Sequence, residues 1–558
     1  MGTRSQEARR GGCVALVIRS FPSVGGKPGV GSRDRSSRRV PAVVGMTGVL
    51  SLALLGTTPA LAQTAEQGRE VYDRWCATCH GTEGRGDGPA AAYMLPRPRD
   101  FTRGTYQIKS TPTGSLPTDA DILRIVDEGM PGTAMPGWRV KLNNQQRRAV
   151  VEYIKTFSPF FASEPPPEQI AVGRAPRATE EGLEEGRVAY DRLECWRCHG
   201  QQGRGDGPSA FEQADDDGFP VRPANLNQSW HFTGGDRPED IYTRLMTGLE
   251  GTPMPSQADA VASGVVSEEQ LWHLANYVRS LSPAQAPRIR EVARATLVEG
   301  TLPASADDPA WDEAEEYFFP LAGQIIVRPR WFAPSVSGVW VAAMHNDEQL
   351  ALRLRWHDPS QSPDPGWQEW QQGVLAAMEP NEGGPEGVQV LPDAFAVQFP
   401  QTIPPGMDRP FFLMGNAREP VYLWRWDSET DRAVQATAQG MDRIDVMADE
   451  QQNLTSQATW VEGEWRLLIS RPLAAPEGSG QLTFETGRAI PIAFYAWDGD
   501  NSEAGTRGAI STWSYLYLDQ PGSNTVYIFP IAATLLTFML GLVFVVRAQR
   551  QKSSPTQP

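Results

Sequence analysis

Two short motifs carry the clearest chemistry of this chain. CATCH and CWRCH each hold two cysteines that are separated by two residues and followed directly by a histidine. This spacing is the attachment pattern of c-type heme. Two thiols on one helical turn can reach both vinyl groups of a porphyrin, and the adjacent imidazole is then held against the iron. The pattern predicts two covalent hemes c, held by Cys76, Cys79 and His80 in the first motif and by Cys195, Cys198 and His199 in the second.

These motifs open a longer internal repeat. GRGDGP and a Met-Pro dipeptide recur after both motifs, all at one offset of 119 residues. GRGDGP fits either a close approach of the backbone to a porphyrin edge or a plain turn. The repeat predicts two tandem all-α domains, at residues 63–163 and 181–284. Their linker, 164–180, is short and stiffened by proline, so close packing of the two units is expected.

Residues 64–283 resemble class I cytochrome c. That family takes its sixth iron ligand from a methionine in a loop well downstream of C-x-x-C-H, often followed by proline, so the resemblance implies one such ligand in each unit. The first unit offers both Met130 and Met135. The repeat favours Met135, because Leu249 stands where Met130 does, whereas Met254 matches Met135. Met135 and Met254 are the expected iron ligands, and Met130 is expected to be a packing residue.

Histidine is the competing sixth ligand. His80 is the only histidine between Gln63 and Ser163, so a second histidine for the first iron would have to come from elsewhere. For the second iron, His231 and His273 are available. His273 lies in a helical pattern and His231 in a loop whose repeat partner is not histidine, so both are expected to be ordinary packing or surface residues. His/Met ligation raises the heme potential and suits electron transfer.

The start of the chain indicates export. A basic run precedes the apolar segment Val43 to Leu55, and Ala-Leu-Ala at 60–62 is a typical cleavage site, so residues 1–62 are predicted to be a signal peptide. The 558-residue chain has a formal net charge of -16. Such acidity argues against a nucleic-acid partner and fits either a solvated surface or a basic partner.

The other end of the chain predicts a membrane anchor. Residues 526–546 carry no charge, and 21 residues at about 1.5 Å each span the hydrocarbon layer of about 30 Å. Three basic residues follow in the tail 547–558, which the positive-inside rule assigns to the cytoplasm. The expected location is therefore the inner membrane, as a single-pass protein with the bulk of the chain in the periplasm.

The sequence pattern changes in residues 289–520, after a proline-rich break. Short alternating or apolar runs are separated by Gly, Pro and Asp, which predicts an all-β domain, an antiparallel sandwich. Tryptophan is abundant there and is expected either in the core or along a pocket. Runs that carry this prediction are 350–356, 394–400, 421–426, 465–473, 489–500 and 511–519.

This third domain resembles the heme-binding domain of the ethylbenzene dehydrogenase gamma-subunit family. The resemblance rests on DDPAW (307–311), MHNDEQLALRLRWHDPS (344–360), FLMGN (412–416) and PIAFYAWDGDNSEAGTRGAISTW (491–513). Members of this family are electron-transfer subunits of exported DMSO reductase-type molybdenum enzymes, and they hold a b heme by Met and Lys. The resemblance therefore implies molybdoenzyme catalytic and iron-sulfur subunits as partners.

The family's b-heme ligands carry over only in part. The Met falls on Met414 in FLMGN, but the chain has no lysine between Lys155 and Lys552. Three outcomes stay open: His345 or His357 replaces the lysine, the heme is held by one protein ligand, or the domain holds no b heme.

Taken together, these features predict a membrane-anchored periplasmic diheme cytochrome. It would carry electrons between a redox partner, a molybdoenzyme complex, and the respiratory chain, and it would not itself be an enzyme, since no catalytic constellation has the required spacing. The alternative makes the β-sandwich a binding module for a carbohydrate or another small ligand, without b heme. A heme enzyme that binds substrate at its iron comes third.

Overall fold

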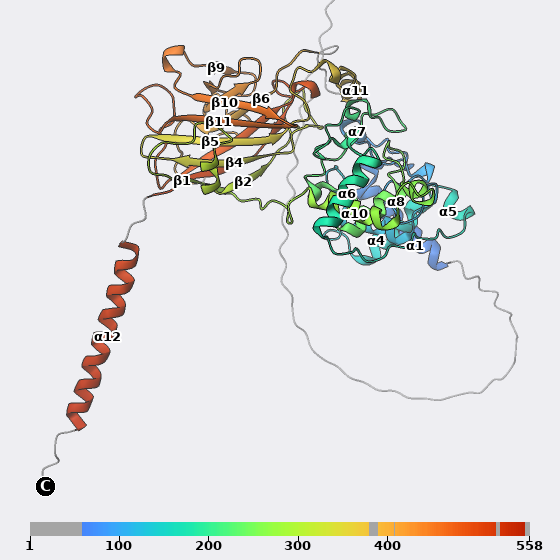
Figure 1. The fold of residues 1–558 in the computed structure, drawn as a ribbon, viewed down its shortest axis with the longest axis horizontal. Coiled ribbons are helices and arrows are strands. Elements are labelled where there is room, and N and C mark those ends of the chain that lie inside the picture. Colours follow the sequence, from blue (N-terminus) through green and yellow to red (C-terminus); the bar gives the residue numbers. More distant parts are fainter. Residues whose placement is uncertain (1–58, 379–388, 407, 521–524, 553–558) are drawn as a thin grey trace, which may run out of the picture. The chain divides into compact units, whose positions relative to one another are not determined.

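The computed structural model describes residues 59–378, 389–406, 408–520 and 525–552 (Figure 1). The predicted signal peptide falls almost entirely on residues 1–58, outside this range. Two helical units come first in the chain, then a domain of strands, and then one long helix. The predicted fold class, two all-α domains followed by an all-β domain and one C-terminal apolar helix, is confirmed.

In each helical unit the first helix packs against the long closing helix, α1 (Pro59–Trp75) against α4 (Asn144–Lys155) and α6 (Glu180–Arg192) against α10 (Glu268–Ser280). Gly68 and Gly186 allow this close crossing, because a Cβ on either would lie 2.1 Å from Ala149 O or 2.2 Å from His273 O. The closing helices start with capping boxes, at Asn143 and Ser267. The first unit also contains α2 (Ala77–His80), α3 (Asp119–Glu128) and α5 (Phe160–Ser163). The second also contains α7 (Trp196–His199), α8 (Pro238–Thr247) and α9 (Ala258–Ala262).

A 14-stranded sheet forms the third domain, with strand order β10-β11-β5-β4-β1-β14-β12-β6-β7-β8-β9 and the short β2, β3 and β13 beside it. Strand β12 joins its two halves, because its first residues pair with β14 and its last with β6. The strands are β1 (Val292–Leu297), β2 (Glu316–Pro320), β3 (Ala322–Gly323), β4 (Gly338–His345), β5 (Gln349–His357), β6 (Ala394–Pro400), β7 (Val421–Asp427), β8 (Val434–Ala438), β9 (Ile444–Val446), β10 (Thr455–Val461), β11 (Glu464–Pro472), β12 (Ala489–Trp497), β13 (Ala509–Ile510) and β14 (Ser514–Leu518).

The sheet departs from the antiparallel prediction at one strand. β1 pairs parallel with both β14 and β4, while the other paired strands run antiparallel. β1 is the first strand of the domain and inserts between strands that come later in the chain, so no hairpin fixes its direction.

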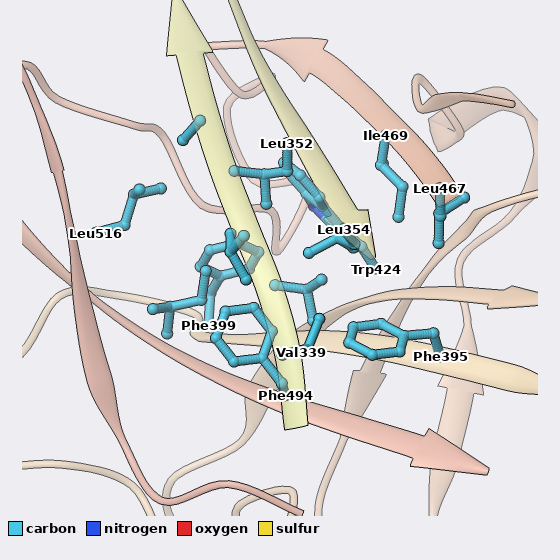
Figure 2. Close-up of a cluster of buried hydrophobic side chains, with 14 of the residues drawn as sticks. Val339, Leu352, Leu354, Phe395, Phe399, Trp424, Leu467, Ile469, Phe494 and Leu516 are labelled. Atoms are coloured by element: carbon cyan, nitrogen blue, oxygen red, sulfur yellow. The ribbon is translucent and has the colours of Figure 1, made fainter. Parts of the chain in front are cut away.

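The core of this domain lies between the two halves of the sheet (Figure 2). Leu352 and Leu354 of β5 meet Phe395 and Phe399 of β6 there, all 0% exposed. Burial of such side chains contributes about 1.5–3 kcal/mol each. Four of the tryptophans also belong to this core, Trp356, Trp424, Trp426 and Trp465.

Two helices complete the third part of the chain. Helix α11 (Gln368–Met378) was not foreseen in a domain predicted to be all-β. Helix α12 (Thr525–Lys552) covers the predicted span 526–546. Within it, Tyr527–Arg550 is long and apolar enough to cross a membrane, with a mean hydropathy of 2.4, and its most apolar 18 residues are not buried.

Candidate heme sites

The first site is organised by helix α2. Cys76 precedes the helix, and His80 N donates to Cys76 O at 2.9 Å, so thiols and imidazole share one turn. His80 Nδ1 donates to Arg99 O at 3.1 Å, which leaves Nε2 as the nitrogen that can bind iron. Burial lowers the pKa of His80 and keeps the imidazole in the neutral form that ligates metals.

The second site repeats this arrangement. His199 N donates to Cys195 O at 2.9 Å, and His199 Nδ1 donates to Ala224 O at 2.9 Å, so Nε2 is again the iron-binding nitrogen. Burial lowers the pKa of His199 as well. All four motif cysteines are free thiols, as thioether attachment requires, so the donor sets of both sites fit a covalent heme c.

Backbone contacts hold both motifs in the same way. Tyr72 and Tyr190 donate their hydroxyls to Gly81 O at 2.8 Å and Gly200 O at 2.7 Å. The GRGDGP turns fold back onto the motifs, because the amides of residues 86 and 205 donate to the carbonyls of the two histidines at 2.9 and 2.8 Å. The glycines therefore serve a turn that buttresses the heme motif.

Arginines of these turns do not share one role. Arg85 pairs with the exposed Glu83 at 3.0 Å. Arg204 instead donates to Glu462 O at 2.7 Å, in the β-domain. The two repeat-related arginines therefore have different partners.

The expected methionine ligands lie in matching loops. Met130 N donates to Met135 O at 3.0 Å, and Leu249 N donates to Met254 O at 3.1 Å. Thr133 and its counterpart Thr252 then accept from the amides of the two methionines, at 3.2 and 3.4 Å. Met130 and Met135 both line the cavity that contains the two sites. Their positions alone therefore do not distinguish which of them binds the iron.

One cavity of about 950 Å³ contains both sites. Both cysteine motifs, both histidines and both predicted methionine ligands line it. Ligand pockets typically measure about 300–1,000 Å³. A single space of this size, lined by two attachment motifs, fits two large planar groups lying close together.

A polar interface holds the two helical units together around this cavity. Lys109 Nζ, with its side chain 1% exposed, donates to Glu250 Oε2 at 2.6 Å. Arg244, 8% exposed, donates to Gln107 O at 3.0 Å. Further ion pairs across the same boundary join Arg103 to Asp217 and Arg124 to Asp240. The sequence predicted close packing but none of these contacts.

The two competing histidines lie in different places. His273 packs between α10 and α6, with Gly182 beside its ring, and it does not line the cavity. His231 does line the cavity, and its backbone lies against Gly132 of the first unit's methionine loop. Burial lowers the pKa of His231. It is thus a wall residue shared by the two units, which its loop position in the sequence did not reveal.

The β-domain also reaches the cavity. His357, Trp370 and Asn501 are among its lining residues. Arg222 of the second unit pairs with Asp498 at 3.3 Å, and its guanidinium lies 4.8 Å from the ring centre of Trp370 on α11. Helix α11, absent from the sequence prediction, therefore helps to build the junction between cytochrome and β-domain.

Met414 does not gain a second ligand from the residues proposed for a b heme. It is 1% exposed in a hydrophobic cluster, and its amide donates to the Tyr495 hydroxyl at 3.1 Å. Both ring nitrogens of His345 contact backbone carbonyls, at 3.2 and 2.9 Å, and His357 lines the c-heme cavity. Both histidines have other contacts and this part of the sequence has no lysine, so the described residues do not assemble a Met/His or Met/Lys pair; a b heme held by Met414 alone stays a prediction.

Family models match three parts of the chain. Residues 63–154 match cytochrome c oxidase, cbb3-type, subunit III, residues 183–282 match cytochrome c, and residues 308–443 match ethylbenzene dehydrogenase. The chain joins two cytochrome c domains to an ethylbenzene dehydrogenase-like domain. Both resemblances inferred from the sequence are confirmed, and the two cytochrome c domains support covalent heme c.

Two curated relatives are named as subunits of reductases. A protein of Haloferax mediterranei named as a respiratory nitrate reductase heme subunit, ORF7, is 24% identical over 261 residues, which are 46% of this chain and 82% of the relative. The chlorate reductase subunit gamma of Ideonella dechloratans is 29% identical over 122 residues, 22% of this chain and 48% of the relative. The chain is therefore a cytochrome c-containing electron-transfer subunit related to these proteins.

Similar solved structures cover the chain in part. A chain of the Kuenenia stuttgartiensis reducing HAO-like protein complex is 46% identical and covers 39% of this chain and 96% of its own, with a TM-score of 0.37. A family 9 carbohydrate-binding module from Caldicellulosiruptor kristjanssonii, in complex with glucose, covers 42% of this chain and 98% of its own at 10% identity and a TM-score of 0.24. At these TM-scores neither likeness carries an argument about function.

Proposed function

We propose that this protein is a membrane-anchored, periplasmic diheme c-type cytochrome. It passes electrons between a molybdoenzyme complex and the respiratory chain. Cys76, Cys79, Cys195 and Cys198 attach the hemes, and His80 and His199 ligate their irons. Met135 and Met254 are the second axial ligands.

The observation that carries this proposal is the shared cavity. Both attachment motifs face one space of about 950 Å³, so two hemes there exchange electrons without crossing a domain of protein. Methionine as the second ligand would close each iron to substrate, which suits relay rather than catalysis. The names of the nitrate and chlorate reductase relatives support a reductase complex as partner.

Helix α12 supports the anchor. Its charge-free stretch is followed by Arg547, Arg550 and Lys552, and basic residues cluster in this way on the cytoplasmic side of inner-membrane proteins. The cytochrome and β-domains then lie on the periplasmic side.

The test uses the full chain, produced with a heme-attachment system and purified from membranes in detergent. Pyridine hemochrome analysis is expected to give two c hemes per chain, and isolation from the native host should bring along molybdenum- and iron-sulfur-containing subunits. The isolated complex should reduce or oxidise both hemes when given its substrate. A protein that purifies alone, with hemes inert toward any molybdoenzyme of the host, would overturn the proposal.

A further inference from the structure

Three aspartates from distant parts of the β-domain converge at one end of the sheet. Asp358 follows β5, Asp393 precedes β6 and Asp498 follows β12. Each is 0% exposed, and a carboxylate oxygen from each lies within 4.8 Å of the other two. The heme sites do not use this cluster.

Hydrogen bonding in the cluster is uneven. Asp393 accepts from the backbone amides of Gly499 at 3.0 Å and Ser362 at 2.8 Å, and from Trp465 Nε1 at 3.1 Å. Asp358 Oδ2, by contrast, is buried and has no hydrogen-bond partner. A buried carboxylate oxygen without a partner carries the full cost of its desolvation. This oxygen points to a ligand that supplies positive charge.

The charges around the three aspartates also indicate a bound cation. Among the residues that the structure describes, the ion pair recorded for the three aspartates is that of Arg222 with Asp498, at 3.3 Å. One guanidinium cannot neutralise three buried carboxylates, and isolated buried charges are strongly disfavoured.

The ligand atoms of the three aspartates indicate which kind of metal ion the site would bind. All three offer carboxylate oxygen, and none offers nitrogen or sulfur. Ca²⁺ takes most of its ligands from protein oxygens at about 2.3–2.6 Å, whereas Mg²⁺ retains several waters, for which three carboxylates that are each 0% exposed leave little access. We propose that Asp358, Asp393 and Asp498 bind one Ca²⁺ ion.

This ion would secure the junction with the second cytochrome unit. It fixes Asp498, whose Oδ2 pairs with Arg222. Two residues further along the chain, Ala224 O accepts from the iron-binding His199. Loss of the ion should therefore disturb the second heme and leave the first unchanged.

The experiment is metal analysis of the full chain in detergent. Mass-spectrometric analysis of the purified chain is expected to find one calcium per chain. Dialysis against EGTA should remove it, lower the thermal midpoint of unfolding and alter the spectrum of the second heme alone, and added Ca²⁺ should reverse these changes. A chain without bound calcium, whose midpoint is the same in EGTA and in Ca²⁺, would overturn the proposal, as would stoichiometric magnesium or manganese in its place.

Variants localise the site. Asp358→Asn should lose the calcium and the response of its midpoint to EGTA. The control Asp347→Asn, an exposed aspartate in the turn between β4 and β5, should keep both. Calcium that survives in Asp358→Asn would place the ion elsewhere. The wild-type analysis needs no variant, so the proposal stays testable if Asp358→Asn fails to fold.

Discussion

Replacing Glu250 by Gln should weaken the contact between the two cytochrome units severely. The substitution leaves the ammonium of Lys109, 1% exposed, with Ser115 O at 2.6 Å but without its carboxylate partner. Breaking a buried pair in this way costs about 3–5 kcal/mol. Deprotonation of Lys109 sets an upper bound on this loss of stability, because taking a proton from a lysine of pKa 10.5 at pH 7 costs about 5 kcal/mol. We expect the free energy of unfolding to fall by about 3–5 kcal/mol at pH 7.

The matched control crosses the same boundary at the surface. Asp217→Asn breaks the 2.6 Å pair with Arg103, whose two side chains are 51% and 44% exposed, and such pairs contribute about 0.2–1 kcal/mol. Denaturant unfolding of the heme-loaded chain, followed by Soret circular dichroism, measures both variants. If Glu250→Gln loses no more stability than Asp217→Asn, the argument from burial is wrong.

The stability of the Glu250→Gln variant should also depend on pH. Burial lowers the pKa of Lys109 in the folded chain, Arg244 lowers it further, and Glu250 and Asp121 oppose the shift. Between this lowered value and 10.5 the unfolded chain binds more protons, so stability rises with pH. Because Glu250 raises the pKa of Lys109, Glu250→Gln lowers that pKa further, and the pH range in which stability rises extends to lower pH. Its stability deficit relative to wild type should therefore shrink as pH rises above 7, and a deficit that grows would contradict this linkage.

Three further outcomes test the cofactors and the anchor. Met135→Ala and Met254→Ala should each convert one low-spin heme to a form of lower potential, seen by absorption and redox titration, whereas Met130→Ala should keep both low-spin signals; an unchanged Met135→Ala spectrum would remove that ligand. Pyridine hemochrome should contain c heme alone before and after Met414→Leu, and a b-heme band lost in this variant would restore the third cofactor. A chain ending before Thr525 should leave the membrane fraction with both hemes attached, and membrane retention would refute the anchor.

The heme motifs could be predicted because their chemistry is local. C-x-x-C-H places its thiols and imidazole within five residues, and the internal repeat then aligned Met135 with Met254. Side-chain spacing along one helical turn follows from the sequence alone. The strands β5, β7 and β11 were likewise visible as short apolar runs, and they lie within a residue of the predicted ranges.

Contacts between distant segments could not be predicted in this way. Lys109 and Glu250 are 141 residues apart and are not related by the repeat. Asp358 and Asp498 meet only because the ends of β5 and β12 come together in the folded sheet. Helix α11 was missed because the sequence assigned no element to its residues, and the contact of Trp370 with Arg222 of the neighbouring cytochrome unit joins segments far apart in the chain.

The parallel pairing of β1 with β14 has a mechanical consequence. The chain arrives from the second cytochrome unit at the start of β1 and departs toward α12 from the end of β14. A pull between the heme units and α12 therefore acts on opposite ends of two adjacent parallel strands. Their hydrogen bonds, which are evenly spaced in a parallel pair, are loaded in shear and share the force, instead of opening one by one as in a pulled hairpin. Tension along the chain meets the sheet in its most resistant direction.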